Sequence, residues 1–252
     1  MEKKGQVTIF IIIAIVIVVA AVLIYSFYPQ IKSGLGIGLK NPRAFIQECI
    51  EEEIEDAVEK VSLQGGSIEP EHYIFHDNQK VEYLCYTGEY SKVCSIQRPL
   101  LKSHIEDEIK EEIEDEVSNC FDSLKNSYEK KGYNVILKTG VMEIELLPKR
   151  VVSVFNYSLT LTKGDTESHD SFEVILNNNL YELVAIADSI IDWEATYGDA
   201  ETTVYMNYYH DLKVEKTLKS DGTKIYILTD RNRGNKFQFA SRSLVLPPGY
   251  PI

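Results

Sequence analysis

The stretch VTIFIIIAIVIVVAAVLIYSFY, from Val7 to Tyr28, decides how the rest of the chain is interpreted. It contains no charged side chain, and Val, Ile, Leu and Phe dominate it. As an α-helix it would rise ~33 Å, enough to cross a hydrocarbon core of ~30 Å. In lipid an isolated segment satisfies its backbone hydrogen bonds only as a helix. The sequence therefore predicts a transmembrane helix over residues 6–28, with membrane lipid as its partner through Val7–Tyr28.

The residues around this helix predict the domain organisation. Residues 1–5 would form a short cytoplasmic tail. Residues 29–41 hold Gly34, Gly36 and Gly38 between two prolines, which favours a flexible tether over a continued helix. Residues 42–252 would form one extracytoplasmic domain. Basic residues lie on both sides of the hydrophobic stretch and do not fix the orientation, but long domains cross the membrane largely regardless of charge.

All four cysteines, Cys49, Cys85, Cys94 and Cys120, follow the hydrophobic stretch. An even number of cysteines in an exported domain indicates two disulfides, and four cysteines allow three pairings. Cys49 and Cys120 lie on or near the apolar sides of two predicted helices, and Cys85 and Cys94 bracket a short loop. We expect the pairs Cys49–Cys120 and Cys85–Cys94. The cysteines also favour a single-pass protein of the cell membrane, with the N-terminus in the cytoplasm and the C-terminal domain outside.

The domain is predicted to be α+β. A helix should begin at Asn41-Pro42 and stop at Gly65-Gly66, and a second helix after Pro99 carries an apolar residue at nearly every fourth position, so the two helices should pack together. From Tyr133 the hydrophobic period changes to two, which predicts an antiparallel sheet with a hairpin that turns at Thr139-Gly140. The other expected elements are a third helix, Asn179–Trp193, and strands at 73–75, 81–86, 151–161, 171–176, 213–218, 223–228 and 236–241.

Charge and motifs exclude several function classes. The formal net charge of −13 disfavours nucleic acid as a partner. No G-x-S-x-G, H-E-x-x-H or P-loop pattern occurs. The acidic run from Glu106 to Glu116 lacks the looped geometry of calcium sites, so we interpret it as a solvated helix face. The histidines are too scattered to form a zinc site. We expect no catalytic residue, no metal ligand and no cofactor.

Two further features leave alternatives open. Asn156-Tyr157-Ser158 fits the N-glycosylation sequon, and Asn156 would point away from its neighbours on a predicted strand, which permits exposure. The tyrosines late in the chain would make a binding patch if they were exposed together, and ordinary sheet packing if they alternated. We favour packing for this group, which comprises Tyr197, Tyr205, Tyr208, Tyr209 and Tyr226.

The N-terminus resembles a known type of export signal. Lys3-Lys4-Gly5-Gln6, directly before the hydrophobic stretch, is similar to the archaeal class III signal peptide of type IV pilin-like proteins. The resemblance implies cleavage between Gly5 and Gln6, with the hydrophobic segment kept on the mature protein. At the fifth mature position this chain has Phe10 where that family usually has Glu, which argues against assembly into a filament.

A second resemblance covers more of the chain. Phe45-Ile46-x-x-Cys49-Ile50, Gln64-Gly65-Gly66, Cys120-Phe121 and Phe237-Gln238-Phe239-Ala240 are similar to anchored envelope proteins of small-genome archaea. This resemblance implies a location and a fold but no chemistry. We expect a non-catalytic binding or structural role with envelope proteins as partners. The alternatives are a minor pilin-like subunit and an exported hydrolase with an unrecognised site.

Overall fold

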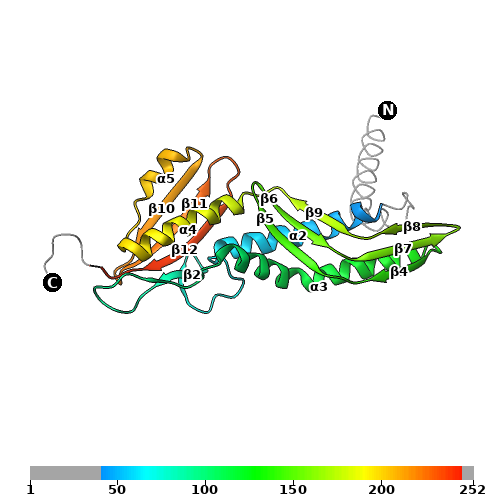
Figure 1. Cartoon of the computed structure of the whole chain (residues 1–252), viewed down its shortest axis with the longest axis horizontal. Coiled ribbons are helices and arrows are strands. Elements are labelled where there is room, and N and C mark those ends of the chain that lie inside the picture. The colour runs from blue at the N-terminus through cyan, green and yellow to red at the C-terminus, as the bar shows by residue number, and fades with distance from the viewer. Residues whose placement is uncertain (1–40, 246–252) are drawn as a thin grey trace, which may run out of the picture. The chain divides into compact units, whose positions relative to one another are not determined.

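The computed structural model describes residues 41–245 (Figure 1). The mixture of helices and sheets confirms the α+β class. No helix within residues 41–245 is long and apolar enough to cross a membrane. The predicted tail, transmembrane helix and tether lie outside the described residues, apart from Asn41.

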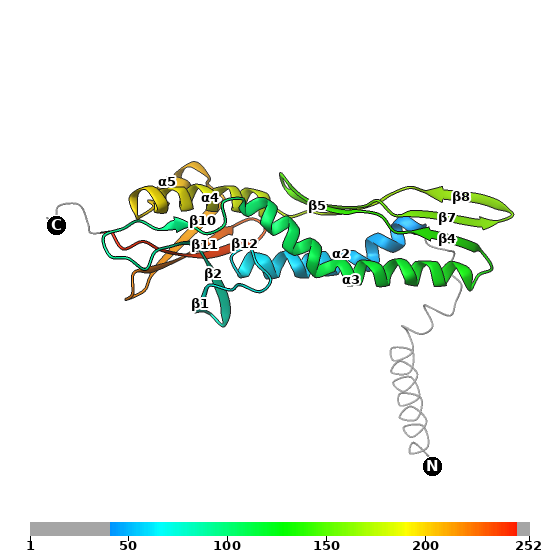
Figure 2. The same cartoon turned by 60° about the horizontal axis from the view of Figure 1, so that its bottom comes forward.

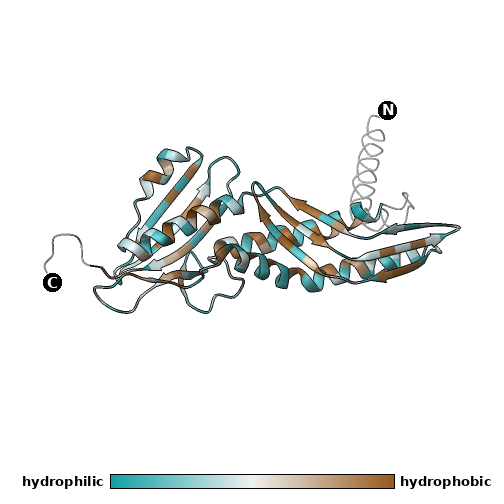
Figure 3. Cartoon of the chain, viewed as in Figure 1, coloured by the Kyte–Doolittle hydropathy of each residue, from teal (hydrophilic) through white to brown (hydrophobic). Residues whose placement is uncertain are grey.

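Helices α2 (Pro42–Leu63) and α3 (Leu101–Glu129) pack against each other, as the sequence predicts. Both helices bury one apolar stripe and turn charged residues outward, which gives the alternating colours along their ribbons in Figure 3. Cys49 of α2 and Cys120 of α3 form a disulfide with 6.1 Å between their Cα atoms. The second disulfide joins Cys85 and Cys94. The two pairs are those expected from the helix faces and the short loop.

The largest sheet has six strands in the order β1-β2-β12-β11-β10, with β3 paired to β2. The strands are β1 (Tyr73–His76), β2 (Gln79–Tyr86), β3 (Ser95–Ile96), β10 (Leu212–Leu218), β11 (Thr223–Asp230) and β12 (Lys236–Arg242). All neighbours are antiparallel except β12 and β2, which pair in parallel. The prediction of a purely antiparallel sheet is therefore wrong. Strands β2 and β12 are far apart in sequence, so no tight turn forces them to be antiparallel.

Three sheets replace the single predicted sheet, and the two smaller ones are β4-β7-β8 and β5-β6-β9. Their strands are β4 (Asn134–Lys138), β5 (Met142–Leu147), β6 (Arg150–Phe155), β7 (Ser158–Lys163), β8 (Asp165–His169) and β9 (Phe172–Leu176). The chain crosses between the sheets at 139–141, 156–157 and 170–171. Lys138 pairs with Ser158 and Met142 with Phe155, so the first two crossings lie at one level. Figure 2 shows the two sheets one after the other along α3.

The predicted hairpin at Thr139-Gly140 is wrong, because β4 and β5 belong to different sheets. The turn lies instead at Pro148-Lys149, where Lys149 has a φ of 65° and β5 folds back onto β6. Gly140 has another role. A Cβ atom at this position would lie 2.0 Å from the carbonyl oxygen of Asn156, so only glycine lets the two segments approach this closely.

Two groups of contacts form the core. The ring of Phe121 on α3 packs against the rings of Phe155, Tyr157 and Phe172. Helix α4 (Leu180–Tyr197) lies on the larger sheet, as Figure 1 shows. Its apolar residues are buried there. The predicted third helix is therefore present and extends to Tyr197. The short helix α5 (Thr202–Tyr208), which the sequence analysis did not predict, has no buried residue.

Candidate functional site

A cleft of about 560 Å³ lies along α4, bounded by α5, the start of β10 and the turn between β11 and β12. Its size falls within the range of ~300–1,000 Å³ that is typical of small-molecule sites. We call it the α4–α5 cleft. Its wall combines aliphatic, aromatic and polar side chains, namely Lys149, Asn179, Tyr181, Glu182, Leu183, Ala185, Ile186, Ser189, Tyr205, Tyr209, Asp211, Leu212, Asp230, Asn232 and Arg233.

A hydrogen-bond network of amide and carboxylate side chains stabilises one end of the cleft. Asn179, which is 7% exposed at the start of α4, donates from Nδ2 to Oδ2 of Asp230 at 2.6 Å. Its Oδ1 accepts from Nδ2 of Asn235 at 2.8 Å. The other oxygen of Asp230 accepts from the backbone N–H groups of Asn232 and Arg233 at 2.7 and 3.0 Å. The network therefore fixes the β11–β12 turn against the N-terminus of α4.

Three tyrosines line the cleft: Tyr181 on α4, Tyr205 on α5 and Tyr209 just after α5. The hydroxyl of Tyr205 lies 2.9 Å from Oγ of Ser189, which links α5 to α4. The carboxylate of Glu201 accepts from the backbone N–H of Thr203 at 3.0 Å and caps α5. Helix α5 carries Tyr205 and ends just before Tyr209. None of its residues is buried, so polar contacts hold it in place.

The preference for sheet packing of the late tyrosines is wrong for four of the five. Only Tyr226 is in the sheet, where it is fully buried. Tyr197 ends α4 and Tyr208 ends α5, and both are exposed. The ring of Tyr197 lies 4.8 Å from that of Trp193, and the ring of Tyr208 lies 4.8 Å from that of Tyr209. The alternative of an exposed aromatic surface therefore describes this region better.

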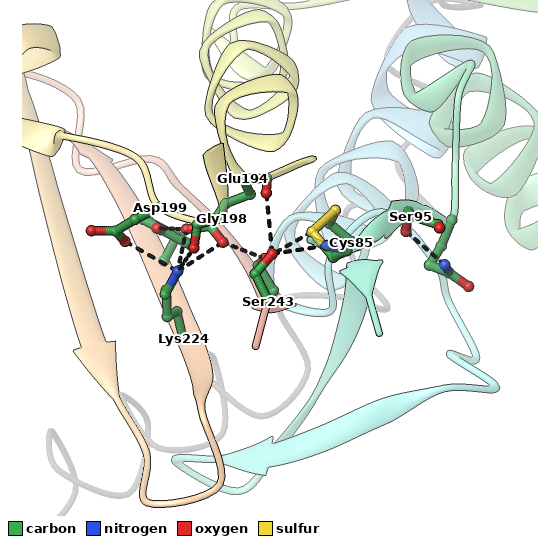
Figure 4. Close-up of a disulfide and its surroundings, with 11 residues drawn as sticks. Cys85, Ser95, Glu194, Gly198, Asp199, Lys224 and Ser243 are labelled. Carbon is green, nitrogen blue, oxygen red and sulfur yellow. Dashed lines mark hydrogen bonds and ion pairs between the residues drawn. A yellow bond between two sulfur atoms is a disulfide. The ribbon is translucent and has the colours of Figure 1, made fainter. Parts of the chain in front are cut away.

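A buried ion pair lies under the C-terminal half of α4 (Figure 4). The fully buried carboxylate of Glu194 accepts from Nζ of Lys224 at 3.0 and 2.9 Å. It also accepts from the hydroxyl groups of Tyr226 and Ser241. Burial and the charge of Glu194 raise the pKa of Tyr226, which stays a neutral donor. Because several donors already satisfy the carboxylate, we interpret Glu194 as a structural tie between α4 and the sheet.

The same network reaches the second disulfide. Oγ of Ser243 accepts from the backbone N–H of Cys94 at 2.9 Å and donates to the carbonyl oxygen of Glu194 at 3.1 Å. Partial burial alone would raise the pKa of Asp199, but hydrogen bonds from Lys216 and Lys224 lower it overall. The Cys85–Cys94 bridge and the buried ion pair therefore form one continuous structural unit, visible in Figure 4.

Asp188 on α4 is a half-buried carboxyl group with a raised pKa. Burial raises the pKa of Asp188 to about 6, and the neighbouring carboxylate of Asp192 contributes in the same direction. Neither residue lines the α4–α5 cleft. The shift therefore bears on stability, which falls as the buried group ionises.

Ser67 and His104 are the pair that most resembles catalytic machinery. Oγ of Ser67 lies 2.8 Å from Nε2 of His104 and donates to Glu82 at 2.5 Å. The carboxylate of Glu108 faces the same Nε2 at 3.7 Å, whereas a catalytic triad has its carboxylate on the opposite ring nitrogen. Ser67 is also only 2% exposed, and Glu82 is held by Arg98. This geometry indicates that Ser67 stabilises the turn after α2 and does not act as a nucleophile.

The acidic face of α3 is only partly solvated. Glu111, Glu114 and Glu116 are exposed, as predicted. Glu106 instead accepts from the backbone N–H of Leu146 at 2.7 Å, and Glu108 accepts from that of Ile68 at 2.7 Å. These carboxylates position neighbouring segments, a role that charge patterning alone does not reveal. Within residues 41–245 no cluster of three or more His, Cys, Asp or Glu side chains is arranged to hold a metal ion.

Asn156 lies in the crossing between β6 and β7, so its placement on a strand is wrong. Its backbone N–H donates to the carbonyl oxygen of Val141 at 3.0 Å, and the residue is exposed. Glycosylation of Asn156 stays a prediction. The processing residues Gly5 and Gln6 lie outside the described residues.

Comparison with family models, curated proteins and solved structures finds no match to this chain.

Proposed function

We propose that the chain is a membrane-anchored envelope protein whose domain from residue 42 onward faces the outside of the cell and binds another envelope component without catalysing a reaction. The observation that carries this proposal is the state of the cysteines. All four are paired, and three of them are buried. Disulfides built into a core persist in oxidising compartments and are rare in a reducing cytoplasm. The apolar stretch Val7–Tyr28 would supply the anchor.

A binding role suits the domain better than catalysis. The carboxylate of Glu194 is already saturated, and the Ser67–His104 pair lacks triad geometry. The α4–α5 cleft instead offers a preformed concave surface, and exposed Trp193 and Tyr208 lie on the helices that border it. Aromatic side chains of this kind are enriched where proteins bind their partners.

The orientation is tested with protease on intact cells. The domain should be degraded when protease is added outside, and the non-reducing mobility of the protein should change after reduction and alkylation. A Cys49→Ala/Cys120→Ala variant serves as the matched control for the disulfides. It keeps only the Cys85–Cys94 bridge, so reduction and alkylation should shift its mobility through that bridge alone. Four freely alkylated thiols, or a domain that resists protease until the cells are lysed, would contradict the proposal.

We further propose processing after Gly5, which is supported by the basic residues and the Gly5-Gln6 pair directly before the hydrophobic stretch. Mass spectrometry of the purified protein should find Gln6 as the first residue. A Gly5→Leu variant should keep the unprocessed mass. A mature protein that begins at Met1 or Glu2 would exclude this route and the pilin-like alternative that depends on it.

A further inference from the structure

We infer that the α4–α5 cleft binds a neutral carbohydrate, in the form of a short saccharide. The inference rests on the proposed function for the source of this ligand, because an outward-facing domain meets envelope glycans. The lining of the cleft supports the binding itself, independently of the position of the domain and of the anchor.

The aromatic lining provides the first reason. Tyr181 comes from α4, and Tyr205 and Tyr209 come from α5 and its C-terminal end, and all three line one cleft. A tyrosine offers an apolar ring face and a polar hydroxyl in one rigid side chain. Within residues 41–245 the hydroxyls of Tyr181 and Tyr209 make no hydrogen bond. A pyranose ring, with one C–H face and several hydroxyls, matches this combination.

The charge of the lining provides the second reason. The cations Lys149 and Arg233 are set among the carboxylates Glu182, Asp211 and Asp230. A phosphate or carboxylate ligand would require mainly positive walls, and a cationic ligand would require negative ones. A lipid chain would require a lining without this many polar groups. A neutral ligand that both donates and accepts hydrogen bonds fits the mixed lining best.

Pre-organisation provides the third reason. The Asn179–Asp230–Asn235 network is complete without a ligand, so this end of the cleft keeps its shape when empty. The Ser189–Tyr205 contact holds the opposite side in the same way. A site that is already ordered loses little conformational entropy on binding, which matters for ligands that form mainly weak contacts.

The test uses the full chain in nanodiscs, because sugar-based detergents would compete for the cleft. The probes are glucose, galactose, mannose, N-acetylglucosamine, maltose and cellobiose, with glucuronate and inorganic phosphate as anionic comparisons. Saturation-transfer NMR detects binding, and titration gives the affinities. We expect at least one neutral sugar to bind. Tyr209→Ala should weaken its affinity at least about fivefold, as loss of an important contact residue does.

The matched control is Tyr90→Ala. Tyr90 is 84% exposed and does not line the cleft, so the affinity of this variant should stay within about twofold of the parent. A second variant, Ala185→Trp, fills the cleft from an exposed position on α4 and should abolish binding without breaking a hydrogen bond. Thermal unfolding checks that each variant is folded.

Three results would overturn the inference: no neutral sugar binds, both tyrosine variants lose affinity equally, or an anionic probe binds more tightly than every neutral sugar. Any of these can occur while external protease still degrades the domain on intact cells, so failure of the ligand class is distinguishable from failure of the proposed location.

Discussion

Removal of each disulfide should destabilise the domain by an amount set by the loop that it closes. Cys49 and Cys120 are 71 residues apart, and Cys85 and Cys94 are 9 residues apart. In the chain-entropy model at 25 °C, closing these loops stabilises the folded state by ~4.4 kcal/mol for the Cys49–Cys120 bridge and by ~2.6 kcal/mol for the Cys85–Cys94 bridge. We therefore expect Cys49→Ala/Cys120→Ala to lose ~2 kcal/mol more than Cys85→Ala/Cys94→Ala.

The burial of the bridges makes this ranking a demanding test. Cys85 is fully buried and Cys94 is 3% exposed, so local packing alone would predict the larger loss for the short loop. The assay is urea unfolding of the full chain in nanodiscs, followed by tyrosine and tryptophan fluorescence. The slope of the transition must be compared too, because removal of a cross-link expands the unfolded state. A loss for the short loop that equals or exceeds that for the long loop would refute the entropic reasoning.

Three further perturbations have defined outcomes. Lys224→Met leaves the buried carboxylate of Glu194 without its cation and should lower the free energy of unfolding by ~3–5 kcal/mol, measured with urea. Adding Glu194→Gln should recover at least half of this loss, and no recovery would contradict the ion-pair interpretation. Asp188→Asn should stabilise the domain by ~1 kcal/mol at pH 7.5, after allowance for solvent screening, and by nothing near pH 3.5. The sign follows from the raised pKa of about 6, since stability is lost as the pH rises through that value, and a pH-independent gain would exclude this cause. Gly140→Ala should lower the free energy of unfolding by ~1–3 kcal/mol, measured by heat or urea. Gly88 has open space around it, so Gly88→Ala should leave the stability unchanged, and equal effects of the two variants would contradict the close approach of Gly140 to Asn156.

Local patterns predicted the helices well. The apolar stripes of α2 and α3 have the period of a helix, and prolines and glycines mark where these helices begin and end. The apolar stripes put Cys49 and Cys120 on or near the sides of the two helices that face each other, which predicts their pairing. The helix faces depend on residues within a few turns of each other, which is the range over which sequence patterns are informative.

The small sheets could not be predicted in the same way. A period of two identifies a strand but does not name its partner. Thr139-Gly140 has the composition of a turn, yet Gly140 is required by its approach to Asn156, which is distant in sequence. Pro148-Lys149 forms the turn instead, with a positive φ at a lysine that no turn preference indicates.

The α4–α5 cleft lay beyond sequence reasoning for a related reason. Helix α5 buries no residue and so has no apolar period to detect. The one local signal was Glu201 two residues before Thr203, a capping arrangement that could have indicated a helix start. The link between Asn179 and Asp230 joins a helix to a distant turn and exists only in the folded chain.

The place of β12 in the larger sheet has a consequence for biogenesis. This strand follows all the others in sequence but lies between β2 and β11. The hairpins β1–β2 and β10–β11 can each form from strands that are neighbours in sequence, but the edges that they present to each other stay unpaired until β12 joins the sheet. Unpaired edges invite association with other chains, so the incompletely folded domain is exposed to aggregation until its final strand is available.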